Sequence, residues 1–345
     1  MSVAVERVLL TKEGGVNVPA LGCGCWSWGD DKGVWGWDHS AKFAEYDSYD
    51  KTLSESSVEE AFFANISGGV QFYDTAETYG SGLSEKLVGK FARKFLKANK
   101  ASTEPSAGRV LIATKFQPGK WKKQSVRAAM MKAAQDSCKR LGVEQIDLYQ
   151  IHAPLHRDPL SEQAEGLADL VDAGLVRAVG VSNFSLEQML EIHAALATRG
   201  VPLASNQVEF SILRQLPLQN GMLAECKRLG VQLLAYSPLA MGRLTGKYSS
   251  QNAPQGARGF SNYPMEELEP LLETLGKLAQ QYEKTISQVA LNWVIANGAL
   301  PIPGSKNATQ ARDNTGALGW ALREEDVTQL TSLGKRGGTS HWQQG

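Results

Sequence analysis

The chain alternates short apolar runs with longer helical patterns, and this alternation limits the folds open to it. The runs that we expect to form strands are Leu21–Cys25, Val70–Asp74, Val110–Lys115, Ile146–His152, Val176–Val181, Ala204–Val208, Val231–Tyr236 and Leu300–Pro303. The helical patterns that follow them are Leu53–Ile66, Leu83–Leu96, Lys123–Leu141, Leu160–Asp172, Ser185–Ala197, Gly221–Leu229, Ile286–Ala296 and Ala308–Ala317. Alternating strands and helices imply a parallel sheet. Eight such units in 345 residues favour a closed (β/α)8 TIM barrel over an open sheet.

Local signals mark where several of these helices begin and end. Ser185 and Thr285 each start a capping box, because a glutamine stands three residues further on. Gly142 and Gly230 follow the last residues of two helical patterns, and glycine is typical of the position just after a helix. These signals support the division of the chain into the eight units.

Three further elements lie outside the eight units. Val8–Leu10 and Val16–Val18 flank a turn-forming sequence and predict a β-hairpin, which we expect to close the N-terminal end of the barrel. Extra helices are expected near Glu266–Tyr282 and over Glu324–Leu333. We therefore predict that residues 1–345 form a single barrel domain.

Composition excludes several classes of protein. Lys and Arg together number 36, as do Asp and Glu, so the net charge of zero argues against a nucleic-acid partner. No apolar stretch is long enough to span a bilayer, so no membrane association is expected. The N-terminus resembles neither a signal nor a transit peptide, so we expect a cytoplasmic protein, or a chloroplast one if a transit peptide has been removed. The four cysteines lack the spacing of a zinc or thioredoxin motif, so free thiols and no metal are expected.

Four chemically active side chains stand at or just beyond the ends of three predicted strands. They are Asp74, Tyr79, Lys115 and His152. In a barrel, the carboxyl ends of the strands meet at one face, where barrel enzymes hold their catalytic groups. Taken singly, the aspartate suits a turn, the lysine suits a solvated tip and the histidine suits the core. Their joint placement instead predicts a proton-transfer site.

The residue types suggest how such a site would work. A lysine ammonium lowers the pKa of a neighbouring phenol, so Lys115 is expected to make Tyr79 a better acid. Asp74 would keep Lys115 charged and in place, and His152 would direct a substrate carbonyl at Tyr79. Together they would protonate a carbonyl oxygen while hydride reaches the carbon from another source.

Several segments together resemble the aldo-keto reductase family. The segments that carry the resemblance are Phe72–Gly80, Ala113–Lys115, Asp147–His152 and Gly180–Phe184, and the likeness extends from about Leu21 to about Asn314. The opening Trp26–Asp30 is similar to plant and cyanobacterial-type members. The resemblance implies a (β/α)8 barrel that uses NADPH without a Rossmann domain. It also implies Tyr79 as the general acid, with Lys115 and Asp74 tuning it and His152 orienting the substrate.

The cofactor is expected at the loops after the seventh and eighth strands, where barrels often hold phosphate. Gly22–Ser27 does not match the dinucleotide fingerprint, and Gly242–Lys247 is one residue short of a P-loop. By the resemblance, the pyrophosphate would lie along Ser237, Leu239, Gly242 and Lys247. The adenosine end would lie against Ser305, Lys306, Gln310 and Asn314. Lys306 beside Ser305 suggests a 2′-phosphate, and hence NADPH.

The resemblance likewise places the nicotinamide at the strand ends. Ser182, Asn183 and Gln207 would bind its carboxamide, Tyr236 would stack on the ring, and Asp74 lies beside it. Trp26 would cover either the ring or the substrate. Asn183 also suits the cap of the helix that starts near Ser185, and Tyr236 also suits core packing.

The loop after the first predicted strand is rich in aromatic residues. Trp28 is expected to contact the substrate with Trp26, Tyr79 and His152, and the other aromatic residues expected in this wall are Trp35, Trp37, Tyr46 and Tyr49. Ligand pockets are mostly apolar, so an aromatic, aliphatic or quinone-like carbonyl is favoured over a sugar. Mutual packing that holds a long loop is the alternative for each single ring.

The preferred interpretation is an NADPH-dependent aldo-keto reductase that turns small-molecule aldehydes or ketones into alcohols, as a monomer or weak oligomer. One alternative is a cofactor-sensing subunit with little turnover, which an intact catalytic set does not exclude. A barrel lyase or isomerase for a phosphorylated substrate would not need Ser182, Asn183, Gln207 and Tyr236. Pyridoxal reduction remains open within the enzyme interpretation, because similar plant and fungal enzymes catalyse it.

Overall fold

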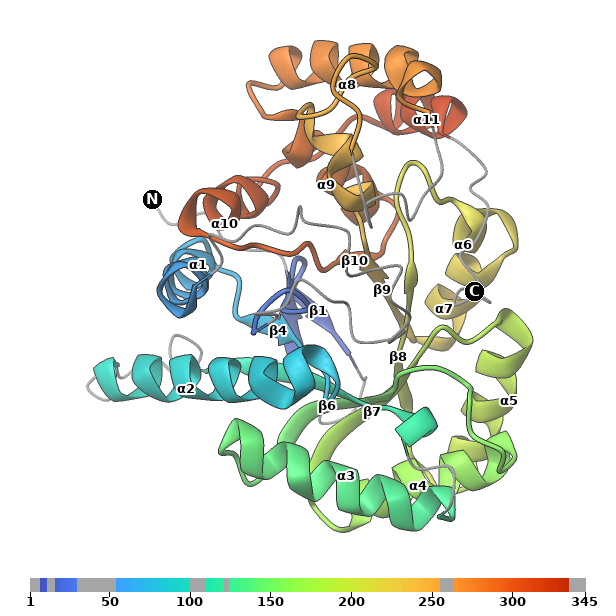
Figure 1. Cartoon of the computed structure of the whole chain (residues 1–345). Coiled ribbons are helices and arrows are strands. Elements are labelled where there is room, and N and C mark those ends of the chain that lie inside the picture. Colours follow the sequence, from blue (N-terminus) through green and yellow to red (C-terminus); the bar gives the residue numbers. More distant parts are fainter. Residues whose placement is uncertain are drawn as a thin grey trace.

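Eight parallel strands form the central sheet, and helices surround it (Figure 1). The computed structural model describes residues 7–10, 16–29, 54–99, 109–120, 124–254 and 264–334. The strands are β3 (Cys23–Gly24), β4 (Phe72–Asp74), β5 (Leu111–Phe116), β6 (Ile146–Ile151), β7 (Val176–Ser182), β8 (Leu203–Glu209), β9 (Gln232–Tyr236) and β10 (Leu300–Pro301). They pair in chain order from β3 to β10. All eight predicted strands are therefore confirmed.

The sheet closes on itself between its first and last strands. Gly24 forms a parallel bridge with Gly304, and the Gly22 and Gly24 amides donate to the carbonyls of Pro301 and Pro303 at 2.9 and 3.0 Å. A Cβ on Gly24 would lie 2.8 Å from the Ile302 carbonyl oxygen, so this seam requires glycine. Pro301 and Pro303 have no N–H to donate, which explains why β10 is shorter than predicted. The structure confirms the predicted (β/α)8 barrel.

The helices lie close to their predicted positions. They are α1 (Glu55–Ser67), α2 (Leu83–Ala98), α3 (Val126–Leu141), α4 (Leu160–Asp172), α5 (Leu186–Ala197), α6 (Leu216–Gln219), α7 (Met222–Leu229), α8 (Glu269–Gln281), α9 (Ile286–Ala296), α10 (Ala308–Thr315) and α11 (Glu324–Leu333). Both predicted capping boxes are formed, at Ser185 and Thr285. The short helix α6 was not expected from the sequence, although Pro217 in its first turn suits a helix start.

The N-terminal hairpin closes one end of the barrel, as expected. Its strands β1 (Arg7–Leu9) and β2 (Asn17–Pro19) pair antiparallel. Leu10, Val16 and Val18 pack into a cluster with the first residues of several barrel strands, which include Phe72, Leu111 and Leu300. These strand residues mark the N-terminal end of the barrel. Because apolar side chains fill that end, the opposite end is left for polar groups.

Strand alternation places the polar groups above this apolar layer. Along β6, Leu148 belongs to the interior cluster, whereas Tyr149 belongs to the core between strands and helices. Because successive strand side chains point to opposite faces, Gln150 faces the interior as Leu148 does. In the same way, Asp74 stands two residues after the interior residue Phe72 on β4. Lys115 stands two residues after the interior residue Ala113 on β5. Along these strands, the inward-facing side chains therefore change from apolar to polar or charged between one inward position and the next.

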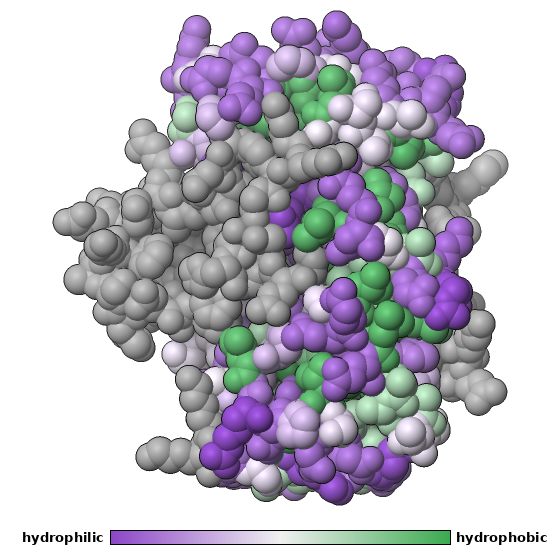
Figure 2. Space-filling view, turned by 90° about the vertical axis from the view of Figure 1, so that its right-hand side faces the viewer, coloured by the Kyte–Doolittle hydropathy of each residue, from purple (hydrophilic) through white to green (hydrophobic). Residues whose placement is uncertain are grey.

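Figure 2 shows the side of the molecule that carries α5, α6 and α7. Outside the grey residues, apolar side chains on this face are interspersed with polar ones. No helix among the described residues is long and apolar enough to cross a membrane.

Candidate active site

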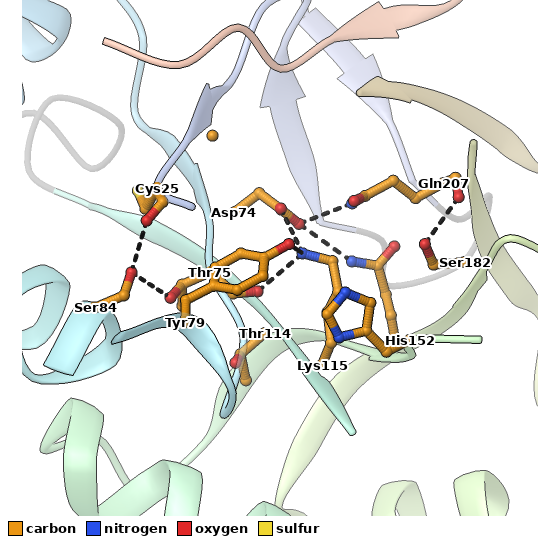
Figure 3. A network of polar contacts seen from close by, with 12 residues as sticks. Cys25, Asp74, Thr75, Tyr79, Ser84, Thr114, Lys115, His152, Ser182 and Gln207 are labelled. Carbon is orange, nitrogen blue, oxygen red and sulfur yellow. Dashed lines mark hydrogen bonds and ion pairs between the residues drawn. The ribbon is translucent and has the colours of Figure 1, made fainter. Parts of the chain in front are cut away.

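Three of the four predicted residues meet at the Lys115 ammonium (Figure 3). Lys115 Nζ donates to Asp74 Oδ2 at 2.5 Å, to the Thr75 carbonyl at 2.9 Å and to the Tyr79 hydroxyl at 3.2 Å. An ammonium has three protons, and three acceptors surround this one. Lys115 is fully buried and Asp74 nearly so. The ammonium is therefore held in one orientation, directed at the phenol.

His152, the fourth residue, follows the end of β6 and lies against Tyr79. The two ring centroids are 5.7 Å apart in an edge-to-face arrangement. The Trp26 ring also lies near Tyr79, with its centroid at 6.1 Å. Asn183 Nδ2 donates to the His152 carbonyl at 3.0 Å, which ties the end of β6 to the end of β7. The structure thus brings all four predicted residues together at the carboxyl ends of β4, β5 and β6.

Burial and charge act on these groups in opposite directions. Burial pushes the pKa of Lys115 down, but Asp74 and Tyr79 outweigh it and the pKa is raised. The pKa of Tyr79 is also raised, because burial of the phenol outweighs the lowering effect of Lys115. Burial, aided by the Lys115 charge, lowers the pKa of His152 well below its usual value. The site therefore holds a protonated phenol and a neutral imidazole, side by side.

The direction of the Tyr79 shift differs from the sequence-based expectation. Lys115 does lower the pKa of Tyr79, as predicted, through its charge and its hydrogen bond. The net shift is upward because an anionic phenolate is costly inside the barrel, and burial is the largest influence. A phenol that keeps its proton is suited to donate it to an acceptor that develops negative charge.

Glycines shape the loop that carries Tyr79. Gly80 and Gly82 have φ angles of +53° and +91°. A Cβ on Gly80 would lie only 2.7 Å from the Gly29 carbonyl oxygen. Thr75 and Ser84 share a hydrogen bond of 2.8 Å, and Ser84 donates to the Cys25 carbonyl at 2.9 Å. The Tyr79 loop is thus packed directly on the turn that follows β3.

We expect Gly80→Ala to destabilise the protein by about 2–4 kcal/mol, because the change adds a left-handed strain of about 1–2 kcal/mol to a steric clash of similar size. Gly174→Ala is the matched control, since Gly174 has a φ of +68° but nothing within 4 Å of a built Cβ. Urea unfolding of both variants measures the difference. Equal losses in the two variants would show that Gly29 does not constrain Gly80.

The residues expected near a nicotinamide form one chain of hydrogen bonds. Tyr236 donates to Asn183 Oδ1 at 2.9 Å, and Asn183 Nδ2 donates to Ser182 Oγ at 3.1 Å. Ser182 Oγ donates to the Gln207 carbonyl at 2.9 Å, and Gln207 Nε2 donates to Asp74 Oδ1 at 2.8 Å. This chain runs across the ends of β7, β8 and β9 to the Asp74 carboxylate. The structure therefore brings these four residues together beside the predicted catalytic group.

The loop after β9 is a tight turn with several left-handed residues. Ser237, Ala240, Met241 and Gly242 all have positive φ angles, between 48° and 93°. Within this loop the Ala240 amide donates to the Ser237 carbonyl and the Gly242 amide donates to the Leu239 carbonyl, both at 2.9 Å. Lys247 lies exposed at the end of this loop. The expected binding of a pyrophosphate by this loop stays a prediction.

The loop from β10 to α10 fits the sequence-based expectation only in part. Ser305 is fully buried, and its hydroxyl lies 3.1 Å from Asn65 Nδ2 and 3.4 Å from Cys23 Sγ. Its side chain therefore braces β3 and α1, and the expected contact with the adenosine end stays a prediction. The Gln310 side chain accepts from the Lys306 amide at 3.0 Å, and Asn314 donates to the Gly304 carbonyl at 3.2 Å. Lys306 itself remains partly exposed.

Trp28 was expected in the substrate pocket, but it belongs to the core. It is fully buried, its rings lie 6.0 Å from those of Tyr73 and Phe91, and its indole N–H donates to the Ser305 carbonyl at 2.8 Å. Its position on the loop after β3 did not reveal which way the ring turns. The other aromatic residues predicted for the pocket wall lie outside the described residues. They are Trp35, Trp37, Tyr46 and Tyr49.

Gln150 is a site residue that the sequence analysis missed. Its Nε2 lies 3.3 Å from Asp74 Oδ1, and the residue is fully buried. The signal was present in the sequence, because Gln150 stands two residues before His152 and hence on the same face of β6. Among the described residues, no group of three or more His, Cys, Asp and Glu side chains is placed to hold a metal ion.

Comparison with known proteins gives a consistent result. The model of the Aldo/keto reductase family matches residues 20–335. A chloroplastic pyridoxal reductase of Arabidopsis thaliana is 37% identical over 94% of this chain and 85% of its own length. A crystal structure of an aldo-keto reductase from Klebsiella pneumoniae in complex with NADPH is similar with a TM-score of 0.68 and 26% identity, covering 95% of each chain. A glycerol dehydrogenase from Gluconobacter oxydans is similar with a TM-score of 0.75 and 25% identity, over 96% of this chain and 95% of its own.

Proposed function

Because the chain belongs to the aldo-keto reductase family, we propose that it reduces aldehydes or ketones to alcohols with NADPH. The observation that carries this proposal is the Lys115 ammonium, held between the Asp74 carboxylate and the Tyr79 hydroxyl. This arrangement of carboxylate, amine and phenol is suited to donate a proton to a carbonyl oxygen. NADPH, when bound, supplies the hydride that reduces the carbonyl carbon.

In this proposal Tyr79 is the general acid. Its raised pKa keeps the phenol protonated, and the developing alkoxide of the substrate is a far stronger base than the starting carbonyl. Lys115 stabilises the phenolate left after proton transfer, because its ammonium already donates to the Tyr79 oxygen. Asp74 keeps that ammonium in place. His152 stays neutral and, at the edge of the Tyr79 ring, orients the carbonyl oxygen by donating a hydrogen bond.

The cofactor assignment rests on three parts of the barrel. The hydrogen-bonded chain from Tyr236 to Gln207 presents amide and hydroxyl groups suited to a carboxamide. The tight turn after β9, which is followed by the exposed Lys247, is proposed to hold the pyrophosphate. Lys306, partly exposed at the start of α10, is proposed to contact the 2′-phosphate that distinguishes NADPH from NADH.

Lys306→Ala is expected to weaken NADPH binding by about tenfold or more, the scale of one charge-assisted hydrogen bond, with no change for NADH. Titration of each cofactor by fluorescence gives the two dissociation constants. Lys97→Ala is the control, because Lys97 is exposed in the last turn of α2, far along the chain from this loop. Equal weakening of NADPH and NADH would place Lys306 away from the 2′-phosphate.

For the substrate, we propose pyridoxal as the first candidate. The likeness to the Arabidopsis pyridoxal reductase supports this choice. The half-buried Trp26 ring lies beside Tyr79 and would offer an aromatic surface to a flat aromatic aldehyde. The alternative of a cofactor-sensing subunit predicts tight NADPH binding without turnover.

The test is NADPH oxidation, followed by the absorbance of the reduced nicotinamide, with a panel of carbonyl compounds. The panel contains pyridoxal, 4-nitrobenzaldehyde, methylglyoxal and a long-chain enal. Oxidation with any of them supports the reductase, and their order of kcat/KM identifies the preferred class. Tight NADPH binding with no oxidation across the panel would instead support the cofactor-sensing alternative.

A further inference from the structure

The Asp74 carboxylate is held at both of its oxygens. Oδ2 accepts from Lys115, as described above, whereas Oδ1 accepts from two side-chain amides. Gln207 Nε2 donates to Oδ1 at 2.8 Å (Figure 3). Gln150 Nε2 donates to the same oxygen at 3.3 Å. Gln207 stands at the proposed nicotinamide site, but Gln150 does not belong to the catalytic set or to the proposed cofactor contacts.

Gln150 is itself held on its other side. Ser205 Oγ donates to Gln150 Oε1 at 3.2 Å, and both residues are fully buried. A carboxylate can only accept hydrogen bonds, so the amide nitrogen of Gln150 must face Asp74 and its oxygen must face Ser205. The hydrogen-bonding pattern therefore fixes the orientation of the Gln150 amide.

The hydrogen bond between Gln150 and Ser205 crosses the intervening strand β7 at a glycine. Gln150 on β6 is paired with Gly180 on β7, and Gly180 is paired with Ser205 on β8. A Cβ on Gly180 would lie 2.2 Å from Ser205 Oγ and 3.2 Å from Gln150 Cγ. Gly180 thus leaves the space in which side chains of two non-neighbouring strands meet.

We propose that Gln150, backed by Ser205 across Gly180, is a positioning residue that sets the orientation of the Asp74 carboxylate. With donors on both oxygens, the carboxylate has little freedom to turn about its Cβ–Cγ bond. Asp74 then holds the Lys115 ammonium toward the Tyr79 hydroxyl. Because an amide is neutral, Gln150 adds this restraint without changing the charge balance of the buried pair.

The competing explanation is that Gln150 merely fills the barrel interior. A filling role predicts that Gln150→Met, which keeps the volume, affects stability alone. A positioning role predicts a slower proton transfer with substrate and cofactor binding intact. Gln163→Met is the matched control, since Gln163 is a buried glutamine on α4 that donates to the Asp158 carbonyl, outside the catalytic layer.

The inference rests on the proposed reductase function, so the wild-type protein is assayed first with the best carbonyl of the panel. For Gln150→Met we expect kcat to fall about tenfold, the effect of losing one hydrogen bond to a charged group. The KM for the carbonyl and the dissociation constant of NADPH should stay within twofold. The solvent deuterium isotope effect on kcat should rise, because proton transfer becomes more rate-limiting. Ser205→Ala should also raise the isotope effect, but by a smaller amount.

Each outcome decides the matter. If Gln150→Met keeps the kcat and the isotope effect of Gln163→Met, the positioning role is wrong while the reductase function stands. If Gln150→Met does not fold, the smaller Ser205→Ala change decides: an unchanged isotope effect overturns the inference. Wild-type protein that binds NADPH but reduces no carbonyl would overturn the reductase function itself, and the inference with it.

Discussion

Tyr79→Phe is expected to lower kcat for carbonyl reduction by a factor of about 100 to 10,000, the contribution of a well-placed general acid. The variant keeps the ring that lies against Trp26 and His152 and loses only the hydroxyl that accepts from Lys115. NADPH binding should therefore stay within twofold of wild type. Steady-state measurement of NADPH oxidation gives kcat, and fluorescence titration gives the dissociation constant of NADPH.

Tyr73→Phe is the control for this change. Tyr73 is buried on β4, and its hydroxyl donates to the Phe62 carbonyl at 2.8 Å, on the helix-facing side of the strand. We expect Tyr73→Phe to cost about 1 kcal/mol of stability and to leave kcat unchanged. Full activity in Tyr79→Phe would remove the phenol from the mechanism and direct attention to His152 as the proton donor.

Lys115→Met is expected to have a double effect, on turnover and on stability. The ammonium is fully buried and is paired with Asp74, so its removal leaves a buried carboxylate without its counter-ion. Breaking a buried ion pair at one partner costs about 3–5 kcal/mol. Turnover should fall at least as far as in Tyr79→Phe, because the phenolate left after proton transfer loses its stabilising charge.

The double variant Asp74→Asn with Lys115→Met separates the two effects. It removes both charges, so urea unfolding should show that most of the lost stability returns, whereas kcat should stay low. Lys132→Met provides the surface comparison, since Lys132 is exposed and pairs with Asp136 within α3. If Lys115→Met were no less stable than Lys132→Met, the Asp74 carboxylate would have to be satisfied by Gln150 and Gln207 alone.

The main features of the fold and of the catalytic group follow from simple regularities of the chain. Strands show a period of two, and parallel strands align their carboxyl ends, so Asp74, Lys115 and His152 were expected at one rim. The same period would have revealed Gln150, which shares a face with His152. The capping boxes at Ser185 and Thr285 were predictable because each involves residues only three positions apart, and both are present in the structure.

What the sequence did not reveal depends on contacts between distant segments. Trp28 and Ser305 lie 277 residues apart, yet the indole of one donates to the carbonyl of the other. Their inward orientation follows from this contact and from the Asn65 side chain, and no local pattern encodes it. The pKa of Tyr79 likewise depends on whether burial or the Lys115 charge is the stronger influence, and that balance requires three-dimensional positions.

The seam between β3 and β10 has a consequence for how the protein avoids aggregation. An open eight-stranded sheet would present two unpaired edges, and such edges can recruit strands from other chains. Here the amides of Gly22 and Gly24 are engaged by the carbonyls of Pro301 and Pro303, so the first and last strands cover each other. Only a few backbone hydrogen bonds form this seam. Local opening there would expose both edges at once, so these bonds protect two edges together.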